Sequence, residues 1–357
     1  MKKWVKIVLC VVLALVLLVA GYIAYVFISY HRLGDQTLTP VQSADAAGAV
    51  TTDTAYTVLS YNIGFGAYEP DYGFFMDGGS QSRAWSKERL TANMDAIAAF
   101  LRSQGADFCL LQEVDTDATR TYHLDEREPL YAALPAMSSV YCPNYDSPYL
   151  FCPLTSPHGA SRSGLLTFSA AEITAAARVE LPVESGFMKI LDLDRCYSVS
   201  RIPVDGGGEL VLYDLHLSAY TSDGTIATEQ LKLLLADMQA EYEKGNWCVA
   251  GGDFNKDLLG DSSLYFGAAD KEYSWAQPIP DGVFDNTDVT LVAPLDENAP
   301  VPSCRNADGP YHEGQYVLTV DGFMVTPNVA VSAAEVIDTA FAYSDHNPVK
   351  MTFTLTK

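Results

Sequence analysis

The chain has 357 residues, of which 48% are hydrophobic and 19% are charged. This composition can bury a sizeable core and excludes a chain that is disordered throughout. Four of the 22 basic residues and no acidic residue lie before residue 35, which leaves 18 basic residues against 45 acidic ones, a balance of −27. A region this acidic repels polyanions, so a general nucleic-acid-binding protein is disfavoured.

The first segment predicts a membrane anchor. Residues 7–30 contain no charged residue and are long enough to cross a hydrocarbon core of about 30 Å as a helix. Lys2, Lys3 and Lys6 precede this run, and positive charge tends to stay on the cytoplasmic side. We therefore expect a signal anchor within residues 1–34, a cytoplasmic N-terminus and an extracellular remainder at the cell membrane. A cleaved signal peptide is the alternative, although its apolar stretch is usually about 7–15 residues.

Residues 35–55 are small and polar, which predicts a flexible stalk before a folded domain over residues 56–357. Outside the membrane, disulfides are permitted. Cys142 and Cys152 flank a loop rich in Pro and Tyr and are the best candidate pair, although spacing alone does not fix connectivity. The sequence has no Cys-x-x-Cys motif, so we expect no structural zinc site.

The first part of the domain predicts a βαβ unit. Residues 57–62 and 107–113 form two apolar, strand-like runs. Between them, residues 86–101 carry apolar side chains at helical spacing, with Ser86 as a candidate N-cap and Gly105 at the end. A helix between two strands favours a parallel strand pair.

The later elements predict a mixed sheet. Residues 197–204 and 209–217 flank a glycine-rich turn and should form a hairpin. The following pattern predicts a helix and three strands, over residues 228–242, 246–254, 317–325 and 349–355. Because nothing marks an internal boundary, we expect one α/β domain of packed mixed sheets.

Polar residues follow or end these apolar strands, which would place them along one edge of the sheets. They are Asn62, Gln112, Glu113, Asp214, His216, Asp253, Asn255, Asp321, Asp345 and His346. Each has an ordinary structural explanation alone: an acid leaving the core, a structural histidine, or a turn. Together they suit phosphate-ester hydrolysis, in which carboxylates hold Mg²⁺, a His–carboxylate pair activates water, and Asn and His donate hydrogen bonds. No serine elbow, P-loop or His-Glu-x-x-His motif is present.

In this order, the motifs resemble those of the endonuclease/exonuclease/phosphatase superfamily, over about residues 56–355. The resemblance implies a four-layered α-β-β-α sandwich of two mixed sheets, preceded here by the transmembrane helix. It also implies a Mg²⁺ cofactor, with Mn²⁺ as a substitute. The roles it implies are metal binding by Glu113, Asn62 and Asp345, and catalysis by His346, Asp321, His216, Asp253 and Asn255. Either His346 or Asp253 would take the proton from water.

One position departs from part of the family. Some relatives carry an acidic residue two positions after the first Asn, where this chain has Gly64, so a second tightly held metal is not implied. Four further residues are candidate substrate contacts: Arg120 and Tyr122 just after the metal ligand, and Asn144 and Arg162 on later loops. An exposed, salt-bridged loop is the alternative interpretation for the segment of residues 113–123.

These patterns together predict a phosphodiesterase or phosphatase that acts on a small or lipid phosphate ester. The charge disfavours nucleic acid, but an extracellular endonuclease or exonuclease stays an alternative, as does a non-catalytic binding ectodomain. Residues 7–30 would contact the membrane, and no protein partner is evident.

Overall fold

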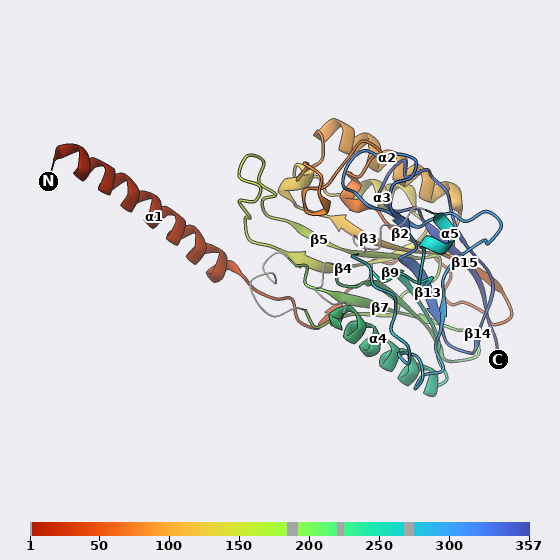
Figure 1. Cartoon of the computed structure of the whole chain (residues 1–357). Coiled ribbons are helices and arrows are strands. Elements are labelled where there is room, and N and C mark those ends of the chain that lie inside the picture. Colours follow the sequence, from red (N-terminus) through yellow and green to blue (C-terminus); the bar gives the residue numbers. More distant parts are fainter. Residues whose placement is uncertain (1, 184–191, 220–224, 268–274) are drawn as a thin grey trace.

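The computed structural model describes residues 2–183, 192–219, 225–267 and 275–357. Two large mixed sheets pack face to face, with helices α2 and α3 over one outer face and helix α4 over the other (Figure 1). The predicted α/β fold, a four-layered sandwich preceded by an apolar N-terminal helix, is confirmed.

The first sheet has the strand order β14–β15–β2–β3–β5–β4. Its strands, in chain order, are β2 (Ala55–Asn62), β3 (Phe108–Asp115), β4 (Ser138–Asp146), β5 (Arg162–Ser169), β14 (Val329–Val336) and β15 (Val349–Leu355). Strands β2 and β3 are parallel, as the βαβ pattern predicts, and α2 (Lys87–Gln104) connects them. The Ser86 hydroxyl accepts a hydrogen bond from the Arg89 amide, and Gly105 ends the helix in the left-handed conformation.

The second sheet has the strand order β1–β6–β7–β8–β9–β13–β10. Its strands are β1 (Gln36–Leu38), β6 (Ala175–Glu180), β7 (Cys196–Pro203), β8 (Glu209–His216), β9 (Trp247–Asp253), β10 (Thr290–Val292) and β13 (Asp321–Val325). Strands β7 and β8 form the predicted hairpin. Strands β8 and β9 are parallel, and α4 (Thr225–Glu243) connects them as a second βαβ unit.

The remaining elements are short. They are α3 (Arg127–Ala133), α5 (Ser263–Phe266), the two-stranded ladder of β11 (Cys304–Arg305) and β12 (Val317–Leu318), and the 3₁₀ turns Gly64–Gly66, Phe75–Asp77 and Thr119–Thr121. The prediction of one strand over 317–325 is wrong in detail, because the chain leaves the ladder at Thr319 and Val320. Their backbone carbonyls accept hydrogen bonds from the loop amides of Leu258 and Phe254.

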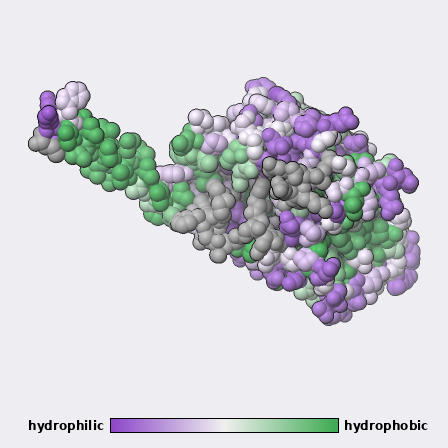
Figure 2. Space-filling model, in the orientation of Figure 1, coloured by the Kyte–Doolittle hydropathy of each residue, from purple (hydrophilic) through white to green (hydrophobic). Residues whose placement is uncertain are grey.

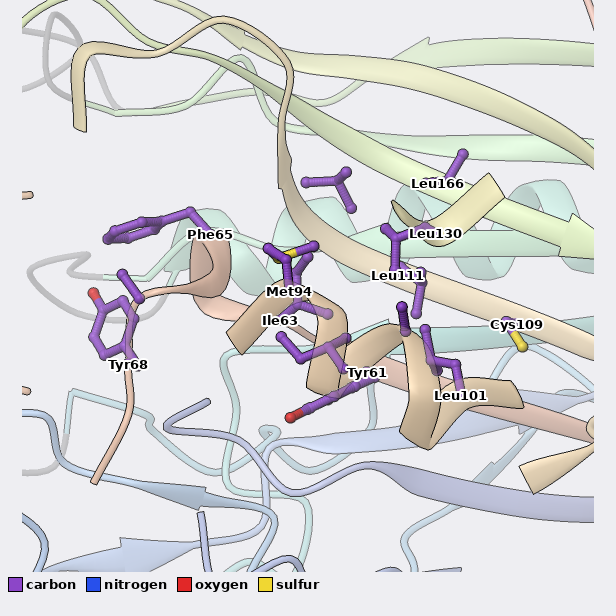
Figure 3. Packing of buried hydrophobic residues seen from close by; sticks show 14 of the residues in the cluster. Tyr61, Ile63, Phe65, Tyr68, Met94, Leu101, Cys109, Leu111, Leu130 and Leu166 are labelled. Carbon is purple, nitrogen blue, oxygen red and sulfur yellow. The ribbon is translucent and has the colours of Figure 1, made fainter. Parts of the chain in front are cut away.

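Three hydrophobic clusters hold the layers together. One lies between the sheets and includes Phe108, Leu212 and Phe323. A second packs α2 and α3 onto the first sheet, and Figure 3 shows its members Tyr61, Met94, Leu101, Leu111, Leu130 and Leu166 side by side. A third packs α4 onto the second sheet. Each fully buried Leu or Phe contributes about 1.5–3 kcal/mol, so these clusters fix the two sheets relative to each other.

Residues 35–55 are not a flexible stalk. Strand β1 pairs antiparallel with β6, and backbone bridges join Val41 to Ser139 and Val50 to Val204. The Val50 side chain is buried in the cluster between the sheets. The folded region therefore begins before Tyr56, because sparse apolar residues in this polar segment are enough to pair with an open sheet edge.

Helix α1 (Lys3–Ser29) projects from the domain (Figure 1), and its surface is largely apolar (Figure 2). It is long and apolar enough to cross a membrane, as a membrane anchor or a signal sequence would be. The candidate pair Cys142 and Cys152 is not supported. Cys152 is exposed, whereas Cys142 is buried with its Sγ 3.7 Å from Sγ of Cys196.

Candidate active site

Four of the predicted site residues come from the two parallel strand pairs. Strand β2 ends at Asn62, β8 at His216 and β9 at Asp253, and Glu113 lies near the end of β3. The carboxyl ends of parallel strands lie at the same edge of a sheet, and ligand-binding crevices are common there. Glu113, His216 and Asp253 line one cleft of about 320 Å³.

The other four come from neighbouring loops and from β13. Asp321 opens β13 directly opposite Asp253 in the antiparallel register. Asn255, Asp345 and His346 line the same cleft. All eight residues predicted to bind metal or to catalyse therefore meet at one end of the sandwich, where the two sheets face each other.

Gly252 allows this assembly. It has φ +153°, and a Cβ at this position would clash with the backbone carbonyl of Leu215. Glycine therefore lets β9 run close beside β8, which brings His216 next to Asp253.

His346 and Asp321 form a hydrogen-bonded pair. Nδ1 of His346 lies 2.8 Å from Oδ2 of Asp321, and the Ser303 hydroxyl donates to the same oxygen at 2.7 Å. Burial lowers the pKa of His346, but the Asp321 carboxylate raises it, and the result lies well above the usual value. Because Nδ1 is held by Asp321, Nε2 is the nitrogen that can exchange a proton in the cleft.

Asp253 lies at the centre of the site. Its Oδ2 accepts a hydrogen bond from Nδ2 of Asn62 at 3.1 Å and lies 3.5 Å from Nε2 of His216 and 3.8 Å from Nε2 of His346. Its Oδ1 accepts from the Asn255 amide at 2.8 Å. Burial raises the pKa of Asp253 to about 7, and His346 partly offsets this rise.

His216 is the second histidine of the cleft. Burial lowers its pKa well below the usual value, and the positive charges of Arg195 and His346 add to this effect. The ring is therefore neutral at pH 7 and can donate one hydrogen bond. Asn255 stabilises the same corner, because its side-chain amide donates to the carbonyl of Leu217 at 2.7 Å.

Glu113 has a strained backbone. Its φ is +57°, and the pairing of β3 with β5 shifts register between Leu111 and Val114. This bulge turns the Glu113 side chain towards the cleft. Burial raises the pKa of Glu113, Arg120 lowers it, and the nearby Asp345 carboxylate raises it again.

The donor set at Glu113 and Asp345 fits a divalent cation such as Mg²⁺. Both are half-buried carboxylates that line the cleft, and desolvation raises the pKa of each. Hard cations prefer such oxygen ligands and would remove the mutual repulsion. Asn62 lies beside this pair: its oxygen accepts from the Gly64 amide and its nitrogen donates to Glu113 Oε1 at 3.2 Å. It therefore positions the Glu113 carboxylate, and its own role as a metal ligand stays a prediction.

A second acidic and histidine cluster consists of Asp253, Asp321 and His346, with one ligand atom of each within 4.8 Å of the others. The short contact between His346 and Asp321 occupies ligand atoms of both residues. This geometry suits proton transfer better than metal binding.

The predicted substrate contacts Arg120 and Tyr122 differ in their positions. Arg120 lines the cleft, but its guanidinium donates two hydrogen bonds to Asp115, at 2.9 and 2.8 Å, and stacks on the Phe65 ring. Tyr122 does not line the cleft, and its hydroxyl donates to the carbonyl of Ala84. Arg120 thus supplies positive charge near Glu113 and is fixed by the ion pair, whereas Tyr122 lies outside the cleft lining.

Arg162 and Asn144 also lie outside the cleft lining. Arg162 is exposed and pairs with Asp117 and Asp146. Asn144 is buried at a bulge of β4, and neither of its side-chain amide atoms has a hydrogen-bond partner among the described residues. Sequence spacing does not show on which side of a loop or bulge a side chain lies, so it did not indicate that these two residues lie away from the cleft lining.

Arg195 is a cleft residue that the sequence did not indicate. It is buried and lines the cleft, its Nε lies 3.2 Å from Oδ1 of Asp192, and its Nη1 has no hydrogen-bond partner within the described part of the chain. An unpartnered guanidinium nitrogen in a cleft is suited to bind an anion. No motif surrounds Arg195, so only the fold could reveal it.

The model of the Endonuclease/Exonuclease/phosphatase family matches residues 59–346. The chain belongs to this family. The match spans every catalytic and metal-binding residue predicted above. No curated protein matches the chain by sequence.

Solved structures of this family share the fold. A protein from Beutenbergia cavernae superposes with a TM-score of 0.56 at 18% identity, covering 85% of this chain and 72% of its own. A protein from Bacteroides vulgatus gives 0.54 at 15% identity, covering 85% and 100%. ANGEL2, a 2′,3′-cyclic phosphatase solved with adenosine-2′,3′-vanadate, gives 0.57 at 14% identity, covering 90% and 99%. At these identities the similarity concerns the fold alone.

Proposed function

We propose that the protein is a metal-dependent hydrolase of phosphate esters, a phosphodiesterase or phosphatase, whose catalytic domain lies outside the cell membrane. The observation that carries this proposal is the His346–Asp321 pair, which faces Asp253 and shares one cleft with Glu113 and Asp345. The family match supports the hydrolase class.

In the proposed reaction, Asp321 holds Nδ1 of His346, and Nε2 of the neutral imidazole accepts a proton as a water oxygen attacks phosphorus, the ester P–O bond breaks and the leaving oxygen takes a proton from solvent. Because Asp321 raises the pKa of His346, only the deprotonated fraction of the ring acts as the base, and the rate should rise with pH. Asp321 then stabilises the imidazolium that forms. Asp253 orients the water, and the neutral His216 donates a hydrogen bond to a phosphoryl oxygen. Glu113 and Asp345 would hold Mg²⁺ or Mn²⁺, which supplies charge neutralisation of the phosphoryl oxygens.

We place the domain outside because Lys2, Lys3 and Lys6 precede the apolar helix α1, and positive charge tends to stay inside. The acidic balance of −27 beyond residue 34 favours small or lipid phosphate esters over nucleic acid.

The test is hydrolysis of a chromogenic phosphodiester and a chromogenic phosphomonoester by the full chain in detergent, with Mg²⁺ and with chelator. We expect metal-dependent activity that falls about 10²- to 10⁴-fold in His346→Ala, because a general base contributes about that much. His312→Ala, which changes an exposed histidine outside the cleft, is the matched control and should keep full activity. Equal activity in both variants would contradict the proposal. Steeply salt-dependent cleavage of DNA would favour the nuclease alternative.

A further inference from the structure

The end of helix α1 contacts one loop of the catalytic domain, residues 147–157, which we name the 147–157 loop. The Tyr22 hydroxyl donates a hydrogen bond to the carbonyl of Tyr149 and accepts one from the amide of Phe151 at 2.8 Å. The Tyr25 hydroxyl accepts from the amide of Tyr149 at 3.1 Å. The rings of Tyr22 and Phe151 meet edge to face, with centroids 5.5 Å apart.

These contacts fix the loop at a definite level along the helix. The 27 residues of α1 extend about 40 Å, whereas the hydrocarbon core needs about 20 residues or 30 Å. Counted from Ile7, the first residue after Lys6, these 20 residues end near residue 26. Tyr22 and Tyr25 therefore lie in the last turns of this span, next to the far membrane–water interface, where tyrosines are enriched. The 147–157 loop must lie at the same level.

The composition of this loop suits that position. It contains no charged residue, and Phe151 and Leu154 are 51% and 85% exposed. Figure 2 shows the apolar surface of α1 reaching the domain edge that it contacts. Large exposed apolar side chains beside a membrane helix have a ready partner, the bilayer that holds this helix.

The same loop forms part of the cleft wall. Leu150 and Cys152 line the cleft together with Phe74, Phe75 and Met76. Ser82, which follows Phe74, Phe75 and Met76 in the chain, donates a hydrogen bond to the carbonyl of Ser156 in the 147–157 loop. This contact connects the two segments that supply the apolar cleft residues. One side of the cleft is therefore apolar and continuous with the loop beside α1, whereas its floor carries the carboxylates and histidines.

We propose that the 147–157 loop inserts Phe151 and Leu154 into the interface of the bilayer that anchors α1, so that the cleft receives the phosphate ester of a membrane lipid headgroup. This inference rests on the proposed hydrolase activity for its substrate and on the proposed membrane placement of α1 for its docking surface. Because the loop is uncharged and the domain is acidic, the docking is hydrophobic and needs no anionic lipid.

Docking is tested with the full chain in a neutral phosphatidylcholine bilayer. Cys10→Ser and Cys152→Ser remove the two exposed cysteines, and a nitroxide is then attached at Leu154→Cys or, as the control, at Leu264→Cys. Leu264 is a similarly exposed leucine, 77%, on α5, away from α1 in Figure 1. We expect the label at 154 to be accessible to oxygen and protected from a water-soluble nickel complex, and the label at 264 to show the reverse.

Equal nickel accessibility at the two labels would overturn the docking proposal. Protection of position 154 from both oxygen and nickel would also overturn it, because protein, such as a second copy of the chain, and not lipid would then cover the loop. Neither result depends on catalysis.

The substrate class is tested with Phe151→Ser/Leu154→Ser, whose residues do not line the cleft. We expect this variant to release phosphorylated headgroups or phosphate from mixed phospholipid vesicles at least tenfold more slowly, with unchanged hydrolysis of a soluble chromogenic phosphodiester. Leu264→Ser should retain both activities. Unchanged lipid turnover, or equal loss on both substrates, would overturn the inference. Wild-type activity on the soluble ester alone would also overturn it and leave the proposed function standing.

Discussion

Single residues determine the chemistry of the cleft through their fixed partners. The guanidinium groups of Arg120 and Arg195 are both buried and line the cleft, but they differ in whether their nitrogens already have hydrogen-bond partners. Arg120 donates two hydrogen bonds to Asp115, whereas Nη1 of Arg195 has no hydrogen-bond partner among the described residues. Arg195 is therefore the arginine that can bind a phosphate oxygen when substrate enters.

We predict that Arg195→Gln lowers kcat/KM for phosphate esters roughly 10- to 100-fold, because a hydrogen bond to a charged group contributes about 1.5–3 kcal/mol. Arg162→Gln is the matched control, since Arg162 is exposed and pairs with Asp117 and Asp146. It should stay within about twofold of wild type. Steady-state kinetics of the two variants test this prediction. A larger loss of kcat/KM in the Arg162 variant than in the Arg195 variant would refute the role of Arg195 in binding phosphate.

At the scale of elements, an ion-pair network around one buried carboxylate joins α4 to strand β7. The Glu241 side chain is 3% exposed and accepts from Arg201 Nη2 at 2.7 Å, Lys244 Nζ at 2.8 Å and Asn246 Nδ2 at 2.6 Å. The Arg201 hydrogen bonds outweigh burial and hold the pKa of Glu241 at about 2. A carboxyl with a lowered pKa stabilises the fold above its ordinary value of 4.5, and this stabilisation is lost as the pH falls towards 2.

We predict that Glu241→Gln lowers Tm at pH 7 by about 2–6 °C, and that the difference from wild type shrinks between pH 5 and pH 3. Glu229→Gln, on the same helix, removes an exposed pair with Lys232 and should change Tm by about 1 °C or less. Thermal melts across this pH range test both statements. A difference that does not vary with pH would show that the lost carboxylate is not the cause.

The sequence predicted the elements that carry strong local signals. Helix α2 has a capping serine, apolar residues at helical spacing and a terminal glycine, and the β7–β8 hairpin has a run of glycines. Polar residues at strand ends also indicated the catalytic cluster, because strand order determines which ends meet. Strand β1 was missed, since a three-residue edge strand in a polar segment gains its stability from pairing with β6 and not from its own pattern.

Contacts between distant segments could not be predicted in the same way. Gln112 donates to Asp214 at 2.7 Å across the two sheets, although their 102-residue separation gives no local signal. The proximity of Cys142 to Cys196, and not to Cys152, likewise depends on how β4 and β7 pack. The contacts of Arg195 and Arg162 depend on loop paths, which spacing alone does not determine.

At the scale of the whole molecule, charge and anchorage act together. The acidic balance of −27 beyond residue 34 repels nucleic acids and anionic surfaces, so the domain cannot rely on charge to meet its substrate. If helix α1 is the anchor we propose, it holds the domain beside the bilayer, with the 147–157 loop at the same level as Tyr22 and Tyr25. In the proposed reaction, a bound cation and Arg195 would neutralise the charge of the phosphate.

Measuring cation binding by Glu113 is therefore the most direct test of the proposed metal-dependent hydrolase. The full chain in detergent, at about 0.15 M salt, is titrated with Mn²⁺ while free Mn²⁺ is measured by electron paramagnetic resonance. We predict saturable binding at the cleft that Mg²⁺ displaces, that Glu113→Gln weakens at least tenfold, and that Glu335→Gln, an exposed surface control, leaves unchanged. Identical binding by the wild type and the Glu113 variant, or no binding by the wild type, would contradict a metal-dependent site at this end of the sandwich.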